Sequence, residues 1–247
     1  MKKLLVLTNI KTILSQKSFR AVFLGSLFSN MVFGITITLQ VYFATFFFGL
    51  KSAELGLVAL TFVPAAICAF ALTSWLSKKT EKRALAIGLT YACIVTANIA
   101  ILFKYVGYFP PAGHPLVFPL LCLNGFVSML FVVALSIVLL SMTADLVEET
   151  ERKTGHRSEG LYFATFSFTR KVVTGVGIFS SGVLLSLGGE RVMTEGRMND
   201  IALPYMALIA ALYVASLSFL RNFDLTRERH ATNLRQVNAT QSTTADP

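Results

Sequence analysis

The sequence predicts an all-α membrane protein with six transmembrane helices. Of its 247 residues, 54% are hydrophobic and only 14% are charged, whereas soluble domains typically carry about 25% charged residues. The mean hydropathy is +0.65. The apolar residues are also gathered into six runs, each near the ~20 residues that a helix needs to cross ~30 Å of hydrocarbon. These runs cover residues 21–48, 55–76, 84–106, 116–142, 161–187 and 201–220.

The first span, 21–48, contains a regular series of small and polar residues. Ser26, Asn30, Gly34 and Thr38 recur every four residues, so they share one face of a helix. Tyr42 continues the polar set toward the end of the span. Such residues either join helices by hydrogen bonds inside the membrane or line a cavity, and both interpretations stay open.

The next three spans contain fewer polar residues. Pro64 in the second span predicts a kink, because proline removes a backbone hydrogen bond and clashes with the preceding turn. The third span has Tyr91 and Asn98, and the fourth has Asn124 and Ser128. We interpret these four as the same kind of residue as the polar series in the first span.

The fifth span, 161–187, is the only one with ionisable residues at its centre, Arg170 and Lys171. Lys171 lies roughly ten residues from either end, about 15 Å deep at ~1.5 Å per residue. A cation at that depth costs about 2.5–3.5 kcal/mol on insertion scales and indicates a functional site. All 13 acidic residues fall outside the six spans, so no carboxylate of a span is available to neutralise this pair.

Lys171 belongs to a polar stripe. Ser167, Lys171, Thr174 and Ser181 are spaced by four, three and seven residues, which places them near one face. We interpret the stripe as the lining of a water-filled cavity; the alternative is that Lys171 snorkels to the membrane surface. Arg170 lies about 100° away around the helix. It has either a functional role in the site or a structural role that includes contact with lipid.

Small residues in the same span predict close helix packing. Gly177 and Ser181 form a small-xxx-small pair, a pattern that lets two membrane helices approach closely.

The sixth span, 201–220, is followed by a polar end. We expect residues 1–20 to be a cytoplasmic lead-in, residues 21–222 to be the six-helix bundle and residues 223–247 to be a flexible cytoplasmic tail.

The connections between spans alternate sharply in basic content. Sixteen of the 22 Lys and Arg residues lie on one side, four lie on the other, and the remaining two are Arg170 and Lys171. The side with more basic residues is normally cytoplasmic, so we expect both termini in the cytoplasm and the chain in the cell (inner) membrane. Because the basic residues lie in connections, they do not form the basic face of a nucleic-acid-binding fold.

Catalytic and metal-binding patterns are absent from the spans. Cys68, Cys93 and Cys122 lie inside apolar runs without paired spacing and are expected to be small apolar residues buried in lipid or at helix contacts. No span contains His, Asp or Glu, and the connection 143–160 lacks metal-ligand spacing. We therefore expect neither an enzyme nor a metal or cofactor site.

The connection 143–160 carries the most distinctive motif. Ala144-Asp145 is followed by Lys153-Thr154-Gly155-His156-Arg157-Ser158-Glu159-Gly160 and then by Lys171 in the next span. This pattern resembles the glycoside–pentoside–hexuronide:cation symporters of the major facilitator superfamily. The entry 17–20 to the first span and the basic connection 77–83 are also similar to that family, and the resemblance extends over residues 20–222.

The resemblance implies one six-helix bundle of a secondary transporter that moves a sugar or glycoside together with H⁺ or Na⁺ by alternating access. It implies that Lys171 and Ser167 bind the substrate, and the polar stripes add further candidates, Thr174, Asn30 and Tyr42. Asp145 and Arg157 match positions linked to cytoplasmic gating, and we group Arg170 with them. No cofactor is expected beyond the coupling ion.

The resemblance also implies a partner. In the family, the acidic residues that bind the cation come from the amino-terminal six helices, and no segment of this chain is similar to them. We therefore expect a carboxy-terminal half that pairs, within the lipid bilayer, with a second six-helix bundle from a separate chain, a missing upstream half or a second copy. The alternative is a non-transporting membrane subunit or a truncated, inactive half.

Overall fold

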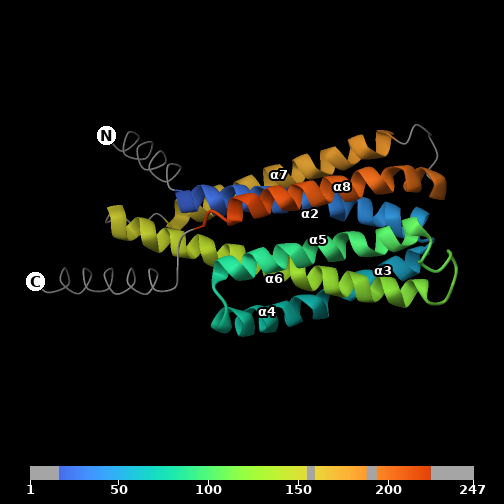
Figure 1. Ribbon diagram of the computed structural model, residues 1–247, viewed down its shortest axis with the longest axis horizontal. Coiled ribbons are helices and arrows are strands. Elements are labelled where there is room, and N and C mark those ends of the chain that lie inside the picture. Colours follow the sequence, from blue (N-terminus) through green and yellow to red (C-terminus); the bar gives the residue numbers. More distant parts are fainter. Residues whose placement is uncertain (1–16, 155–158, 188–193, 224–247) are drawn as a thin grey trace, which may run out of the picture.

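The structure is a computed structural model that describes residues 17–154, 159–187 and 194–223, and every regular element among them is a helix. Figure 1 shows the elements along the chain. They are α2 (Lys17–Tyr42), the π-helix η1 (Phe43–Phe47), α3 (Ser52–Leu60), α4 (Phe62–Lys79), α5 (Lys82–Val106), α6 (Val117–Thr154), α7 (Glu159–Leu187) and α8 (Glu195–Leu220).

These elements form six helical units that are long and apolar enough to cross a membrane. The units are Lys17–Phe47, Ser52–Lys79, Lys82–Val106, Val117–Glu151, Tyr162–Ser186 and Met198–Leu220. The predicted fold class, an all-α membrane protein with six transmembrane helices, is therefore confirmed.

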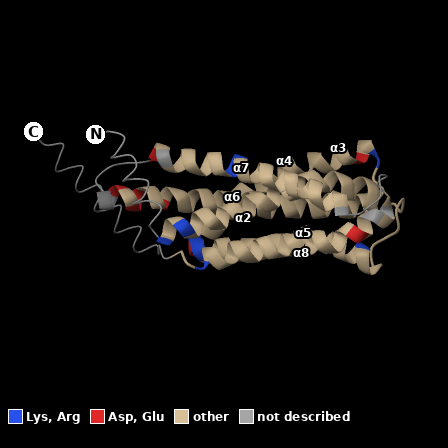
Figure 2. Cartoon of the chain, turned by 90° about the horizontal axis from the view of Figure 1, so that it is seen from above, with Lys and Arg blue, Asp and Glu red and all other residues tan. Residues whose placement is uncertain are grey.

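The helices form two groups. In Figure 1, α2, α7 and α8 lie together above α4, α5 and α6, and the packing agrees: α2 packs on α7 and α8, whereas α6 packs on α4 and α5. The contact of α5 with α8 joins the groups. Figure 2, turned by 90°, shows α5 and α8 along one side, α4 and α7 along the opposite side, and α2 and α6 between them.

The packing of α2 on α7 depends on two glycines. A Cβ at Gly34 would clash with the backbone carbonyl of Thr174, and a Cβ at Gly177 would clash with the carbonyl of Met31. The two backbones therefore touch, as small residues permit between membrane helices. The close packing predicted from Gly177 is confirmed.

The second unit is broken near Pro64, as the sequence predicts. Helix α3 ends at Leu60 and α4 begins at Phe62. Proline clashes with the carbonyl four residues earlier, here Leu60. Thr61 spans the break, because its N–H and its hydroxyl both donate to the carbonyl of Val58, at 3.1 and 2.7 Å.

Helix α6 is longer than the sequence analysis predicts. It has 38 residues, or about 57 Å at ~1.5 Å per residue, and residues 143–154 continue the helix rather than forming a connection. Residues 143–154 contain no Gly or Pro. Leu146 and Val147 are buried, so packing against neighbouring helices stabilises this extension despite its charges.

Most of the charged residues that the structure describes gather at one end of the bundle, and fewer lie at the opposite end, among them Lys51, Glu54, Lys104 and Asp200. Figure 2 shows the more charged end, where α2, α5 and α7 begin and where α4, α6 and α8 end. We name it the basic end, and it includes Lys17, Arg20, Lys78, Lys79, Lys82, Arg83 and Arg221. The basic connections that alternate along the sequence therefore lie together at one end of the bundle.

Candidate functional site

The polar stripe of α7 is exposed only in part, because Ser181 is fully buried and its hydroxyl donates to the carbonyl of Ile178. Lys171 is 12 residues from Glu159 and 16 from Leu187, about 18 and 24 Å at ~1.5 Å per residue. Lys171 and Ser167 are exposed, and Thr174 is half-buried. In Figure 2 the only blue turn within α7 is flanked by uncharged helix. The basic residue therefore lies near the middle of a membrane-length helix, and its side chain is not enclosed by the bundle.

Asn30 on α2 lies level with Lys171. The two helices run in parallel, because Phe19 contacts Tyr162 with ring centroids 5.5 Å apart, whereas Gly34, fifteen residues later, meets Thr174. Counting from these contacts places Asn30 opposite about residue 171. By helical spacing, Asn30 on α2 lies on the same side of the α2–α7 contact as Ser167, Lys171 and Thr174 on α7. We name these three residues of α7 the Lys171 edge.

The side chain of Asn30 is half-buried, and its Nδ2 donates to the carbonyl of Ser26 at 2.7 Å. This bond uses one of the two amide protons, so the carbonyl oxygen and the second proton stay available to a ligand. Counting along the two helices therefore places four of the five predicted substrate-binding residues at one level of the bundle: Lys171, Ser167, Thr174 and Asn30.

The fifth, Tyr42, lies elsewhere. It is 12 residues beyond Asn30 on α2, about 18 Å along the axis, where its ring stacks on Phe46 with centroids 6.3 Å apart. The regular polar spacing of the first span shows which residues share a face of the helix. It does not show which of them lies level with Lys171, and Tyr42 is about three turns away from that level.

The three predicted gating residues, Asp145, Arg157 and Arg170, do not form one group in the structure. Arg170 is exposed within α7 and makes no hydrogen bond or ion pair with any residue that the structure describes. Asp145 lies at the basic end, near the end of α6. Arg157 lies outside the described residues.

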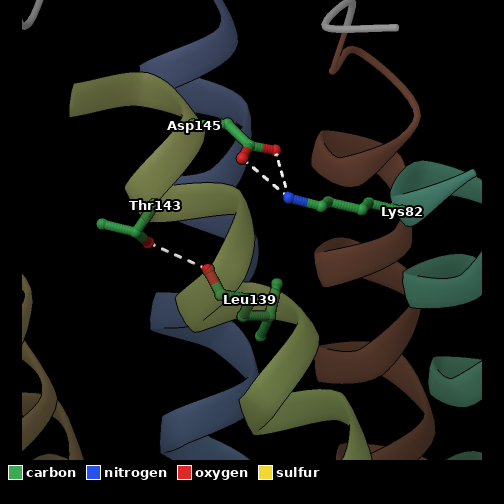
Figure 3. Close-up of polar contacts among 4 residues, drawn as sticks. All are labelled: Lys82, Leu139, Thr143 and Asp145. Atoms are coloured by element: carbon green, nitrogen blue, oxygen red, sulfur yellow. Dashed lines mark hydrogen bonds and ion pairs between the residues drawn. The ribbon is translucent and has the colours of Figure 1, made fainter. Parts of the chain in front are cut away.

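Asp145 forms an ion pair with Lys82, the first residue of α5. Figure 3 shows the ammonium pointing at both carboxylate oxygens, with Nζ 2.7 Å from Oδ1 and 2.8 Å from Oδ2. The Asp145 side chain is only 8% exposed and that of Lys82 is 27% exposed. Two residues earlier on α6, Thr143 donates to the carbonyl of Leu139 at 2.9 Å. The pair ties the start of α5 to α6.

Lys82 was not predicted as a functional residue. The sequence shows four basic residues between the second and third spans, Lys78, Lys79, Lys82 and Arg83, and nothing in their spacing selects one of them as the partner of Asp145. That choice depends on how α5 packs against α6.

A small cavity of about 200 Å³ lies next to the ion pair, between α4 and α6. Its polar lining comes from Thr73, Ser74, Ser77, Ser141 and Lys82. The Oγ1 atom of Thr73 is buried and has no hydrogen-bond partner among the described residues. None of the predicted substrate-binding residues lines this cavity.

A second contact at the basic end joins α6 to α7. The hydroxyls of Thr150 and Tyr162 are 2.5 Å apart, and both residues are buried. Thr150 also donates to the carbonyl of Leu146 at 2.9 Å, so its only hydroxyl proton is used and Tyr162 is the donor to it. The edge of the Tyr162 ring meets Phe19 of α2. This contact fastens the α6 extension to the start of α7.

The cysteines are free thiols on three helices: Cys68 on α4, Cys93 on α5 and Cys122 on α6. Among the residues that the structure describes, no three His, Cys, Asp or Glu side chains form a group that could hold a metal ion.

Comparison with known proteins identifies the family. The family model described as MFS/sugar transport protein matches residues 2–227, nearly the whole chain. No curated protein matches the sequence. The members of this family are membrane transporters rather than enzymes, and their sugar-type substrates agree with the resemblance seen in the sequence. The chain, a multi-pass membrane protein with six membrane-length helices, belongs to the MFS/sugar transport protein family.

Proposed function

We propose that this chain is the carboxy-terminal six-helix bundle of a secondary transporter. It would move a sugar or glycoside together with H⁺ or Na⁺ by alternating access. The observation that carries the proposal is the position of Lys171: a cation at membrane depth, exposed beside a polar edge and level with Asn30, in a bundle of a sugar-transport family. Intramembrane cations are costly and typically mark a substrate or ion pathway.

In this proposal the Lys171 edge holds the substrate. The Lys171 ammonium supplies three donors, which suit sugar hydroxyls or the carboxylate of a sugar acid. Ser167, one turn earlier, and Thr174 supply hydroxyls, and Asn30 faces the same side from α2. Tyr42, about 18 Å further along, would meet the substrate only near the end of the bundle opposite to the basic end.

A second six-helix bundle would complete the site. The side formed by α4 and α7 exposes large apolar side chains: Ile67 (66%), Phe70 (63%), Phe168 (71%) and Phe179 (74%). Covering this side would turn the Lys171 edge into the wall of a cavity, and the partner would supply the carboxylates that the spans lack. A separate chain, an upstream half or a second copy of this chain would each fit this role.

The basic end is proposed to face the cytoplasm of a cell with the chain in its inner membrane, because basic residues favour that side. The Lys82–Asp145 pair and Arg157 would then act at the cytoplasmic gate, where charge contacts form and break as the bundles rock. Arg170, which lies deeper within α7, would take part in gating only if the partner bundle supplies an acid.

The test is uptake of radiolabelled sugars into proteoliposomes that contain the full chain, with and without an imposed H⁺ or Na⁺ gradient. Gradient-driven uptake that is lost in Lys171→Ala and kept in Arg20→Gln, which changes an exposed residue with no assigned role, supports the proposed site. If the chain alone is inactive, the same assay is repeated after co-expression with any six-helix segment encoded in frame upstream. Inactivity in both preparations would favour the alternative, a non-transporting subunit or an inactive half.

A further inference from the structure

We propose that the contact between α5 and α8 at the basic end binds the phosphate headgroup of an anionic phospholipid. The site consists of Arg83, Tyr91 and Arg221, which we name the α5–α8 basic cluster. This inference concerns a different side of the bundle from the Lys171 edge. Only the preference for a lipid over a protein partner rests on the proposed function, through the second bundle on α4 and α7.

Two hydrogen bonds hold the cluster together. Arg83, the second residue of α5, donates from its guanidinium to the backbone carbonyl of Arg221, directly after the end of α8. Arg221 in turn donates from its own guanidinium to the hydroxyl of Tyr91, on α5, at 2.8 Å. Each guanidinium has five N–H donors, so each keeps most of its donors free while its position is set.

The cluster carries excess positive charge. All three side chains are exposed, and neither arginine forms an ion pair with the residues that the structure describes. The nearest acid to Arg83 along the chain is Glu81, the N-cap residue of α5, which is exposed and pairs with neither arginine. The nearest acid to Arg221 is Asp224, which lies outside the described residues. A phosphate that accepts hydrogen bonds from both guanidinium groups would relieve their repulsion, because the guanidinium fork matches phosphate oxygens.

Apolar stripes extend from the cluster toward the middle of the bundle. On α5, Tyr91 is followed by exposed Val95, Ile99 and Leu102 at intervals of four, four and three residues, so they share a face. On α8, Arg221 shares a face with exposed Val214 and Leu203. These stripes provide surfaces for acyl chains directly below a site for the headgroup, and aromatic residues such as Tyr91 favour the interface between them.

The position of the cluster supports a lipid rather than a protein partner. Figure 2 shows α5 and α8 on the side opposite to α4 and α7, so a second bundle docked on α4 and α7 would leave the cluster facing the bilayer. Basic clusters between membrane helices characteristically bind anionic headgroups. A zwitterionic lipid would bring its own ammonium toward the arginines and would bind more weakly.

The experiment is native mass spectrometry of the full chain in neutral detergent, titrated with phosphatidylglycerol or with phosphatidylcholine of the same acyl chains. We expect retained phosphatidylglycerol adducts and weaker phosphatidylcholine adducts. The double variant Arg83→Gln/Arg221→Gln should bind phosphatidylglycerol at least roughly tenfold more weakly. The control Lys78→Gln/Lys79→Gln removes the same charge at the same end, but from α4, and should bind like wild type.

Tyr91→Phe keeps both charges and the ring but removes the hydroxyl that positions Arg221, so a smaller loss of phosphatidylglycerol binding is expected. This variant decides the question if the double variant fails to fold, as judged by circular dichroism in neutral detergent. Equal binding of the two lipids, an equal loss in the α4 control or wild-type binding in Tyr91→Phe would overturn the proposal. Displacement of bound lipid by equimolar inorganic phosphate would also contradict it, because the apolar stripes would then contribute nothing.

Discussion

Lys82 and Asp145 form an ion pair in which the ammonium contacts both carboxylate oxygens, with Nζ–O distances of 2.7 and 2.8 Å. It joins the first residue of α5 to the part of α6 that extends beyond the predicted span. The carboxylate is nearly buried and the ammonium is about one-quarter exposed. Breaking a buried pair by removing one partner is costly, because the other charge loses a counter-charge in a medium of low dielectric constant.

The pair predicts unequal effects of its two truncations. Lys82→Ala should lower the free energy of unfolding by about 1–3 kcal/mol, because it leaves the buried Asp145 carboxylate without its ammonium. Asp145→Asn should cost less, because water can reach the partly exposed ammonium. Chemical unfolding in detergent micelles, followed by fluorescence of Trp75, the only tryptophan of the chain, measures both. A larger cost for Asp145→Asn would contradict the assignment. Arg20→Ala, which changes an exposed basic residue at the same end of the bundle, is the control.

Lys171 predicts a sensitivity to the sign of the charge. In an assembled transporter, Lys171→Glu should reduce sugar uptake far more than Lys171→Ala, because the glutamate would face the proposed carboxylates of the partner bundle. Initial rates of uptake in proteoliposomes at matched protein content measure the difference. Both variants should fold like wild type, since the side chain is exposed in this bundle. Equal losses of uptake would exclude that charge pairing.

The glycine contact between α2 and α7 predicts a sharp contrast between two conservative changes. Gly34→Ala should destabilise the protein by about 1–3 kcal/mol, because the new methyl group would clash with the Thr174 carbonyl, which belongs to the backbone and cannot rotate away. Gly175→Ala on α7 meets nothing within 4 Å and should be neutral or slightly stabilising. Thermal unfolding in detergent compares them, and similar midpoints for the two variants would argue against the close α2–α7 packing.

The Thr150–Tyr162 contact predicts local rather than global weakening. Tyr162→Phe removes the donor to Thr150 and should cost about 1 kcal/mol. The effect should be concentrated in the last turns of α6, which this contact fastens to α7. Hydrogen exchange of residues 143–154 measures it, with Tyr105→Phe, which changes an exposed tyrosine on α5, as control. Unchanged exchange in Tyr162→Phe would show that other contacts hold the extension.

The candidate site could be predicted only in part. Lys171 and Ser167 were identifiable because a lysine at the centre of an apolar run is costly, whatever surrounds it. Asn30 was one of several polar residues in the first span, and only the α2–α7 contacts show that it lies level with Lys171 while Tyr42 does not. Lys82 could not be chosen among its basic neighbours, because an ion pair depends on side chains that the fold brings together.

The end of α6 shows the same limit for the fold. Hydropathy places the end of the fourth span near residue 142, where charged residues begin. The helix nevertheless continues to Thr154, because buried Leu146 and Val147 and the Thr150–Tyr162 contact stabilise it. Hydropathy reports transfer into lipid, whereas this segment is stabilised by packing against protein.

The sequence by itself determined the number of membrane helices, the clustering of basic residues at one end and the presence of a costly cation within the fifth helix. Each of these follows from the transfer energy of individual side chains between water and lipid. Only the tertiary structure decided that α2 lies directly against α7, that Lys82 pairs with Asp145 and that Arg83 and Arg221 meet at one surface. Those relationships join residues more than 60 positions apart in the chain, and they arise from the packing of whole helices, which local composition does not encode.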